Sequence, residues 1–107
     1  MTLASLTSTA LVEIERPTRY GKQLASHLGH KVQVDDLSSG WALHIREGMG
    51  FVLPHESEAD PRLELIAEAD DVETLERIKD VLGRHLLQFT SKVPGVTITW
   101  TDSSVAS

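Results

Sequence analysis

The chain has 107 residues, of which 40% are hydrophobic and 24% charged, a composition typical of one soluble globular domain. Sixteen acidic residues outnumber ten Lys and Arg, giving a formal net charge of −6. The basic residues are scattered along the sequence, so a nucleic-acid partner is not expected. Cysteine is absent, which excludes disulfides, thiolate metal ligands and thiol catalysis.

Domain organisation and location follow from the ends of the chain and its hydropathy. We expect a single domain over residues 1–107, with an ordered core at about residues 9–100 and flexible ends at 1–8 and 101–107. The first residues lack a basic region followed by a long apolar run, and no segment reaches the about 18 apolar residues of a membrane span. A cytoplasmic protein without a membrane partner is therefore predicted.

The first third of the chain predicts a strand and then a helix. Apolar residues alternate over residues 9–15, as in a half-buried strand. Pro17 suits the first helical position, because its missing N–H would have no partner there. Gly29 is expected to end the helix in the left-handed conformation. The apolar face of this helix carries Tyr20, Leu24 and Leu28.

The middle of the chain predicts short strands joined by turns. Period-2 alternation indicates strands at 31–35, 41–46, 51–53 and 63–68. The polar run between the first two predicts a hairpin turn, and Gly48 and Gly50 are expected to form the next tight turn. A last strand is predicted over residues 96–100.

The longest periodic segment is residues 70–89. Asp70 and Glu73 resemble a capping box at its start, and His85 falls inside its apolar stripe. A histidine on the buried face of a helix is unusual enough to examine for function. The apolar residues of the stripe, spaced three or four apart, are Val72, Leu75, Ile78, Leu82, Leu86 and Phe89.

These elements predict an α+β fold, a two-layer sandwich with a mostly antiparallel sheet of about five to six strands and two helices on one face. The order is β-α-β-β-β-β-α-β. A second copy or a ligand could cover the apolar residues of the other sheet face, although scattered exposed apolar residues are also normal. That face is expected to carry Leu11, Glu13, Gln33, Ala42, His44, Arg46, Val52, Glu64, Ile66, Thr97 and Thr99.

Two blocks of the sequence, RPTRYGKQLASHLGHKVQV and EADDVETLERIKDVLGRHLLQF, resemble the bacterial family known as domain of unknown function 2218, over about residues 9–100. The resemblance implies a small stand-alone bacterial domain, sometimes found with ferric-siderophore or iron-reductase machinery. It implies no established activity or ligand. It is carried in the first block by Arg16, Pro17, Tyr20, Lys22, Gln23, His27, His30 and Lys31, and in the second by Glu68, Asp70, Asp71, Gly83, Arg84, His85, Leu86 and Phe89.

The histidines are the candidate metal ligands. If the C-terminal ends of both helices lie together, His27 and His30 approach His85, and a divalent metal or haem iron could bind there. The alternative is that His27 and His85 are structural residues whose ring N–H groups bond to carbonyl oxygens.

Basic side chains near the helices are candidate anion ligands. Tyr20, Lys31 and Arg84 could bind a small carboxylate or phosphate, and the alternative is a solvated face paired with acidic residues. A secondary candidate on the sheet face is the pair His44 and Arg46.

No enzyme signature is present: the sequence has no nucleophile with a base, no phosphate loop and no paired catalytic carboxylates. A binding or accessory role is therefore favoured over an enzyme. One hypothesis is a metal- or haem-linked accessory protein in bacterial iron or siderophore handling. The other is a ligand-free interaction module that forms a homodimer through its sheet face.

Overall fold

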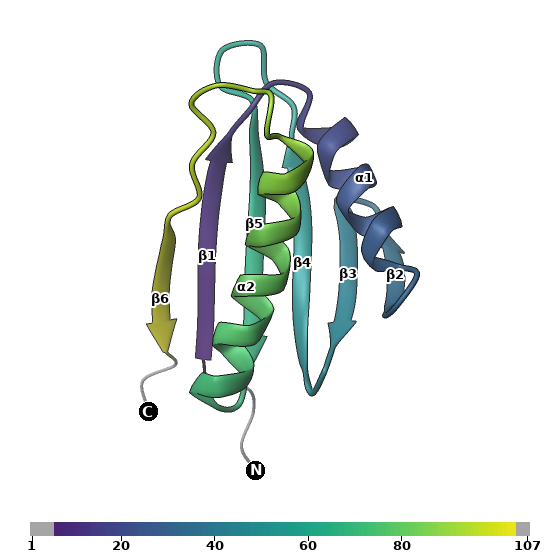
Figure 1. The fold of residues 1–107 in the computed structure, drawn as a ribbon, viewed down its shortest axis with the longest axis vertical. Helices are drawn as coiled ribbons and strands as arrows, with labels where there is room; N and C mark the ends of the chain where they lie inside the picture. The colour runs from purple at the N-terminus through teal and green to yellow at the C-terminus, as the bar shows by residue number, and fades with distance from the viewer. Residues whose placement is uncertain (1–5, 105–107) are drawn as a thin grey trace.

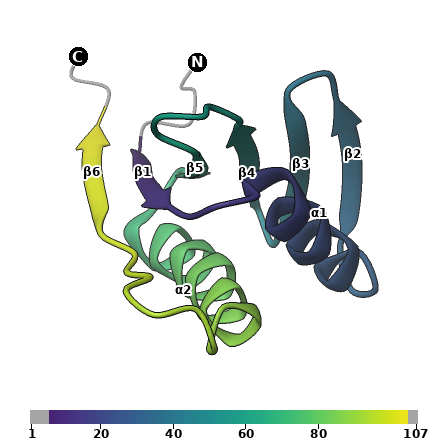
Figure 2. The same ribbon diagram turned by 90° about the horizontal axis from the view of Figure 1, so that it is seen from above.

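The computed structural model describes residues 6–104 as a six-stranded antiparallel sheet with two helices on one side (Figures 1 and 2). Across the sheet the strand order is β2-β3-β4-β5-β1-β6. The predicted α+β sandwich and its element order are confirmed. The elements are β1 (Leu6–Glu13), α1 (Pro17–Leu28), β2 (Gln33–Leu37), β3 (Gly40–Ile45), β4 (Gly48–His55), β5 (Arg62–Ala69), α2 (Val72–Phe89) and β6 (Trp100–Ser104).

The core lies between the sheet and the two helices, which cover the same face (Figure 2). The apolar stripe of α2 packs over the central strands and the stripe of α1 over β3 and β4. Each strand turns every second residue toward this layer. Among the described residues, neither helix is both long and apolar enough to cross a bilayer. The fully buried large residues include Val12, Leu24, Leu43, Val52, Leu63, Leu65, Ile78, Leu82 and Leu86.

The placement of Val52 on the open sheet face is wrong. Val52 is opposite Trp41 in the β3–β4 ladder and is fully buried under the helices. The shift arises because β4 begins at Gly48, so that the predicted glycine turn is part of the strand. Phe51, one residue earlier, therefore points to the open face instead.

The turn between β3 and β4 is formed by Arg46 and Glu47. Arg46 has φ of 54°, the left-handed conformation that such a tight turn requires. Its side chain is therefore carried by the turn and not by a strand, so Arg46 is not a sheet-face neighbour of His44 as predicted.

The last strand is β6, over Trp100–Ser104, and not residues 96–100. Val96 and Ile98 pack against the core from an irregular connection, which leaves the following residues to pair with β1. Thr97 and Thr99 consequently lie in that connection and not on the sheet face. Strand structure also covers residues 6–8 and 101–104, within the ends expected to be flexible; the other end residues lie outside those described.

The helix ends also differ from the sequence interpretation. Asp71, and not Asp70, caps α2, because its carboxylate accepts a hydrogen bond of 2.7 Å from the N–H of Thr74. Gly29 is right-handed, with φ of −63°, so the predicted left-handed end of α1 is wrong. The chain continues past it in hydrogen-bonded turns to the carbonyl oxygens of the last helical residues, which removes the need for a left-handed residue.

Candidate functional site

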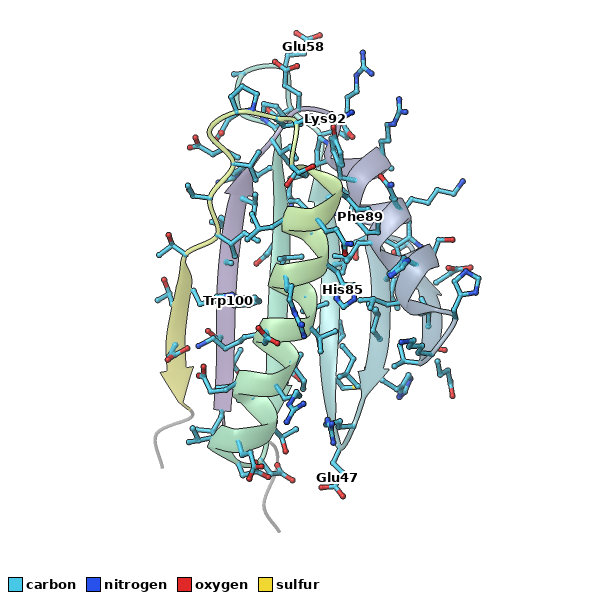
Figure 3. All side chains as sticks on the ribbon, in the orientation of Figure 1. Glu47, Glu58, His85, Phe89, Lys92 and Trp100 are labelled. Atoms are coloured by element: carbon cyan, nitrogen blue, oxygen red, sulfur yellow. The ribbon has the colours of Figure 1, made fainter. Side chains whose placement is uncertain are left out.

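The two helices run in opposite directions and meet where the last turn of α1 lies beside the C-terminal half of α2 (Figure 1). His27 of α1 faces His85 of α2, with ring centroids 5.3 Å apart and planes tilted by 44°. Phe89 meets His27 edge to face at 5.3 Å. Figure 3 shows His85 and Phe89 on α2, and we call His27, His85 and Phe89 the helix seam.

Helical spacing explains why His85 and Phe89 lie on the same side of α2. Val81, His85 and Phe89 follow one another at steps of four residues, so they form one row along the helix. This row lies at the edge of the buried stripe, next to Leu82 and Leu86, and all three of its residues are partly buried. The imidazole of His85 is therefore held by packing while one side of the ring faces α1.

A hydrogen bond fixes the orientation of the His85 ring. Its Nδ1–H donates to the carbonyl oxygen of Val81 at 2.7 Å, one turn earlier in α2. A carbonyl oxygen only accepts, so in the neutral ring the proton is on Nδ1 and Nε2 keeps its lone pair. Among the described residues Nε2 has no hydrogen-bond partner. The same arrangement orients many metal-binding histidines.

His30 does not join the other two histidines. It lies in the turn after α1 and lines a groove of about 310 Å³ that also borders Lys22, Val34 and Trp41, on the β2–β3 side of the helix. His30 is two residues past the end of α1, where its N–H bonds to the carbonyl oxygen of His27. Within residues 6–104, no group of three or more His, Asp or Glu is close enough to hold a metal ion.

The candidate anion ligands are dispersed. Tyr20 lines a cavity of about 960 Å³ at the loop end of the sheet, together with Arg16 and Pro94. Lys31 is exposed in the turn after α1. Arg84 pairs with Asp80 at 2.9 Å and borders a groove beside Trp100, so it faces the β6 side of α2.

Two exposed histidines on the sheet face pair with carboxylates. His44 lies 2.8 Å from Asp35, and this hydrogen bond, with a second from Gln33, holds the pKa of the Asp35 carboxyl below its usual value. His55 lies 2.8 Å from Glu64, a contact that sequence reasoning missed because the two residues are on different strands. Neither pair contacts the helix seam.

Charge is distributed unevenly along the chain. The segments that contribute the residues of the helix seam, 16–34 and 81–101, contain six of the ten Lys and Arg and none of the sixteen acidic residues. These two segments are therefore basic. The remainder of the chain carries a large excess of acid. The basic residues are Arg16, Arg19, Lys22, Lys31, Arg84 and Lys92.

Sequence reasoning anticipated that His27 and His85 would approach each other, on the premise that the C-terminal ends of the two helices lie together; the helices instead run in opposite directions, and the two rings meet where the last turn of α1 lies beside α2. The part played by Phe89 was missed. The signal was available, since Phe89 follows His85 by one turn of the same predicted helix. The hydrogen bond to the Val81 carbonyl could also have been expected, because Val81 precedes His85 by one turn of the same helix.

Comparisons with known proteins identify the family and the fold. The model of the DUF2218 family, described as an uncharacterized protein conserved in bacteria, matches residues 9–101. No curated protein matches the chain. Among solved structures, the NMR structure of PA4090 from Pseudomonas aeruginosa has a TM-score of 0.73 at 23% identity, covering 90% of this chain and 95% of that one.

A second similar structure is the designed protein LFR1 1 with ferredoxin fold, with a TM-score of 0.57 at 13% identity, covering 99% of this chain and 90% of the design. In the present chain strands β4, β5, β1 and β6 have the order of that fold, and the β2–β3 hairpin extends its edge. At these identities the likeness concerns the fold alone.

Proposed function

This chain belongs to the DUF2218 family of bacterial proteins, and we propose that it is a binding protein for an anionic iron chelate, such as haem or a ferric siderophore, at the helix seam. The observation that carries the proposal is the facing pair His27 and His85, with Nε2 of His85 unpaired.

The number of protein ligands favours a chelate over a bare ion. Two imidazoles at a tetrahedral angle on one ion, with metal to nitrogen bonds of about 2 Å, have centroids about 5 Å apart, close to the 5.3 Å between His27 and His85. On haem, whose two open positions are trans, one of the two histidines would bind the iron and the other would lie beside it. A resident metal ion usually has at least three protein ligands, and the described residues offer no third one here. An iron that arrives with its own organic ligands but with a coordination position left open needs only one or two ligands from the protein.

The charge of the helix layer favours an anionic ligand. Haem propionates and ferric catecholates are negative, and the basic residues of segment 16–34, which contains no acidic residue, would attract them. Arg84 contributes less, because it is paired with Asp80. Phe89 adds an apolar ring against which a flat organic group could pack. The likeness of the sequence to a family sometimes found with iron-reductase machinery agrees with this class of ligand.

Titration with haem and, separately, with a ferric catecholate tests the proposal. We expect one of them to bind the wild-type protein with a shift in its visible absorption band, and His85→Ala and His27→Ala to weaken binding at least tenfold. The matched control is His44→Ala, which removes an imidazole on the opposite face of the sheet and should leave affinity unchanged.

Two results would overturn the proposal. The first is a wild-type protein that binds neither compound at a ligand concentration of about 100 µM, which is about 100 times the Kd of a micromolar site. The second is equal affinity in His85→Ala and wild type, with circular dichroism showing that both are folded.

A further inference from the structure

The face of the sheet opposite the helices carries a contiguous group of apolar side chains. Ile66 is opposite Phe51 in the β4–β5 ladder, and Leu11 lies diagonally next to Ile66 on β1. Leu11 is 50% exposed and the others are partly exposed. We call this group the sheet patch; its members are Leu11, Met49, Phe51, Leu53 and Ile66.

Polar pairs border the sheet patch. The pairs His44–Asp35 and His55–Glu64 each join two strands of the same face at 2.8 Å. The same face also carries Glu13, Glu68 and Arg62. An exposed apolar group surrounded by polar residues is typical of a protein interface.

The area of this face is sufficient for a dimer. Six strands about 4.8 Å apart, with up to eight residues at about 3.3 Å each, span a face of about 600 Å². Two such faces in contact would bury about 1,200 Å², above the about 1,000 Å² that a specific interface requires. A second copy supplies a surface of matching size with an apolar centre.

We propose that two copies of this chain pair through their sheet patches, with a two-fold axis that runs between β4 and β5 along the strands. These are the third and fourth of the six strands, so the axis passes through the middle of the face. Phe51 of one copy then packs on Ile66 of the second copy, and the reverse contact forms by symmetry. Open sheet faces pack in this way, about 10 Å apart with interdigitated side chains.

Sedimentation velocity on the wild type and on charged variants tests this interface. The wild type is expected to sediment as a dimer at high micromolar concentration. Phe51→Lys and the milder Leu11→Lys, whose side chain is half exposed, should each weaken the dimer at least tenfold. The matched control is Leu87→Lys, which alters a side chain on α2 that is 44% exposed and should leave the dimer intact.

Three outcomes would overturn the proposal: a wild type that is monomeric at 500 µM, a Leu11→Lys variant that is folded and still dimeric, or a Leu87→Lys variant that dissociates as much as the patch variants. Circular dichroism confirms the fold of each variant. Loss of dimerisation with unchanged chelate binding separates this interface from the helix seam.

Discussion

Lys79 of α2 and Asp102 of β6 form an ion pair of 3.0 Å that ties the edge strand of the sheet to the helix layer. The hydroxyl of Ser8 on β1 also donates to the Asp102 carboxylate. Burial alone would lower the pKa of Lys79, but its hydrogen bonds with Glu76 and Asp102 raise it. The hydrogen bonds from Ser8 and Lys79 hold the pKa of Asp102 below its ordinary value of 3.8.

The first prediction concerns the stability of the protein at low pH. Because the pKa of Asp102 is lower in the folded state, its stabilising effect is present above pH 3.8 and is lost as the pH falls through the folded value. Asp102→Asn keeps an oxygen for Ser8 but removes the charge. Urea unfolding should show this variant to be less stable than wild type at about pH 6 and equal to it well below the ordinary carboxyl pKa. A difference that does not change with pH would contradict the ion pair.

Two helical glycines should respond oppositely to added side chains. A Cβ at Gly83 would lie 3.7 Å from Nε1 of Trp100, an ordinary contact, so Gly83→Ala should stabilise the protein by about 0.5–1 kcal/mol. A Cβ at Gly21 would already lie 3.0 Å from the Trp41 ring, so Gly21→Val should destabilise it by about 1–3 kcal/mol. Urea unfolding measures both, and a stabilised Gly21→Val would show that α1 is not packed closely on the sheet.

Truncation of two leucines in α2 tests which side of the helix is buried. Leu82 is fully buried and Leu87 is 44% exposed. Leu82→Ala is therefore expected to cost about 2–5 kcal/mol and Leu87→Ala well under about 1 kcal/mol, since only the first leaves a cavity. Both substitutions have the same effect on helix propensity, so the difference in the free energy of unfolding isolates burial. Equal costs would mean that the helix is rotated on the sheet.

The order and type of the elements could be predicted because each rests on a local pattern. Alternation identified β1 and β5, and the three- and four-residue spacing identified α2. Strand register could not be predicted in the same way. Whether Val52 faces the helices depends on where β4 starts relative to β3, and glycines that suit a turn are also tolerated in a strand. The end of β6 likewise depends on its pairing with β1, which local composition does not contain.

The positions of candidate site residues could be predicted only for those that lie within a helix, where the periodicity gives the direction of the side chain. His85 belongs to the periodic stripe of α2, so its place on the inner side of the helix could be predicted, whereas the opposite directions of the two helices could not. His30 lies past the end of α1, where the direction of the chain is set by turn hydrogen bonds such as that from Val32 to Leu28. Its separation from His27 therefore required the structure.

The last prediction concerns the proton of His85. The hydrogen bond from Nδ1–H to the carbonyl oxygen of Val81 should hold the neutral ring in the Nδ1–H form. Nitrogen-15 chemical shifts of the two ring nitrogens measure this directly, with protonated Nδ1 and unprotonated Nε2 expected for His85. Exposed His30 is the internal reference, because no ring hydrogen bond to the described residues fixes its tautomer. If His85 instead carries its proton on Nε2, the lone pair that would bind iron points at the helix backbone, and the helix seam could not act as proposed.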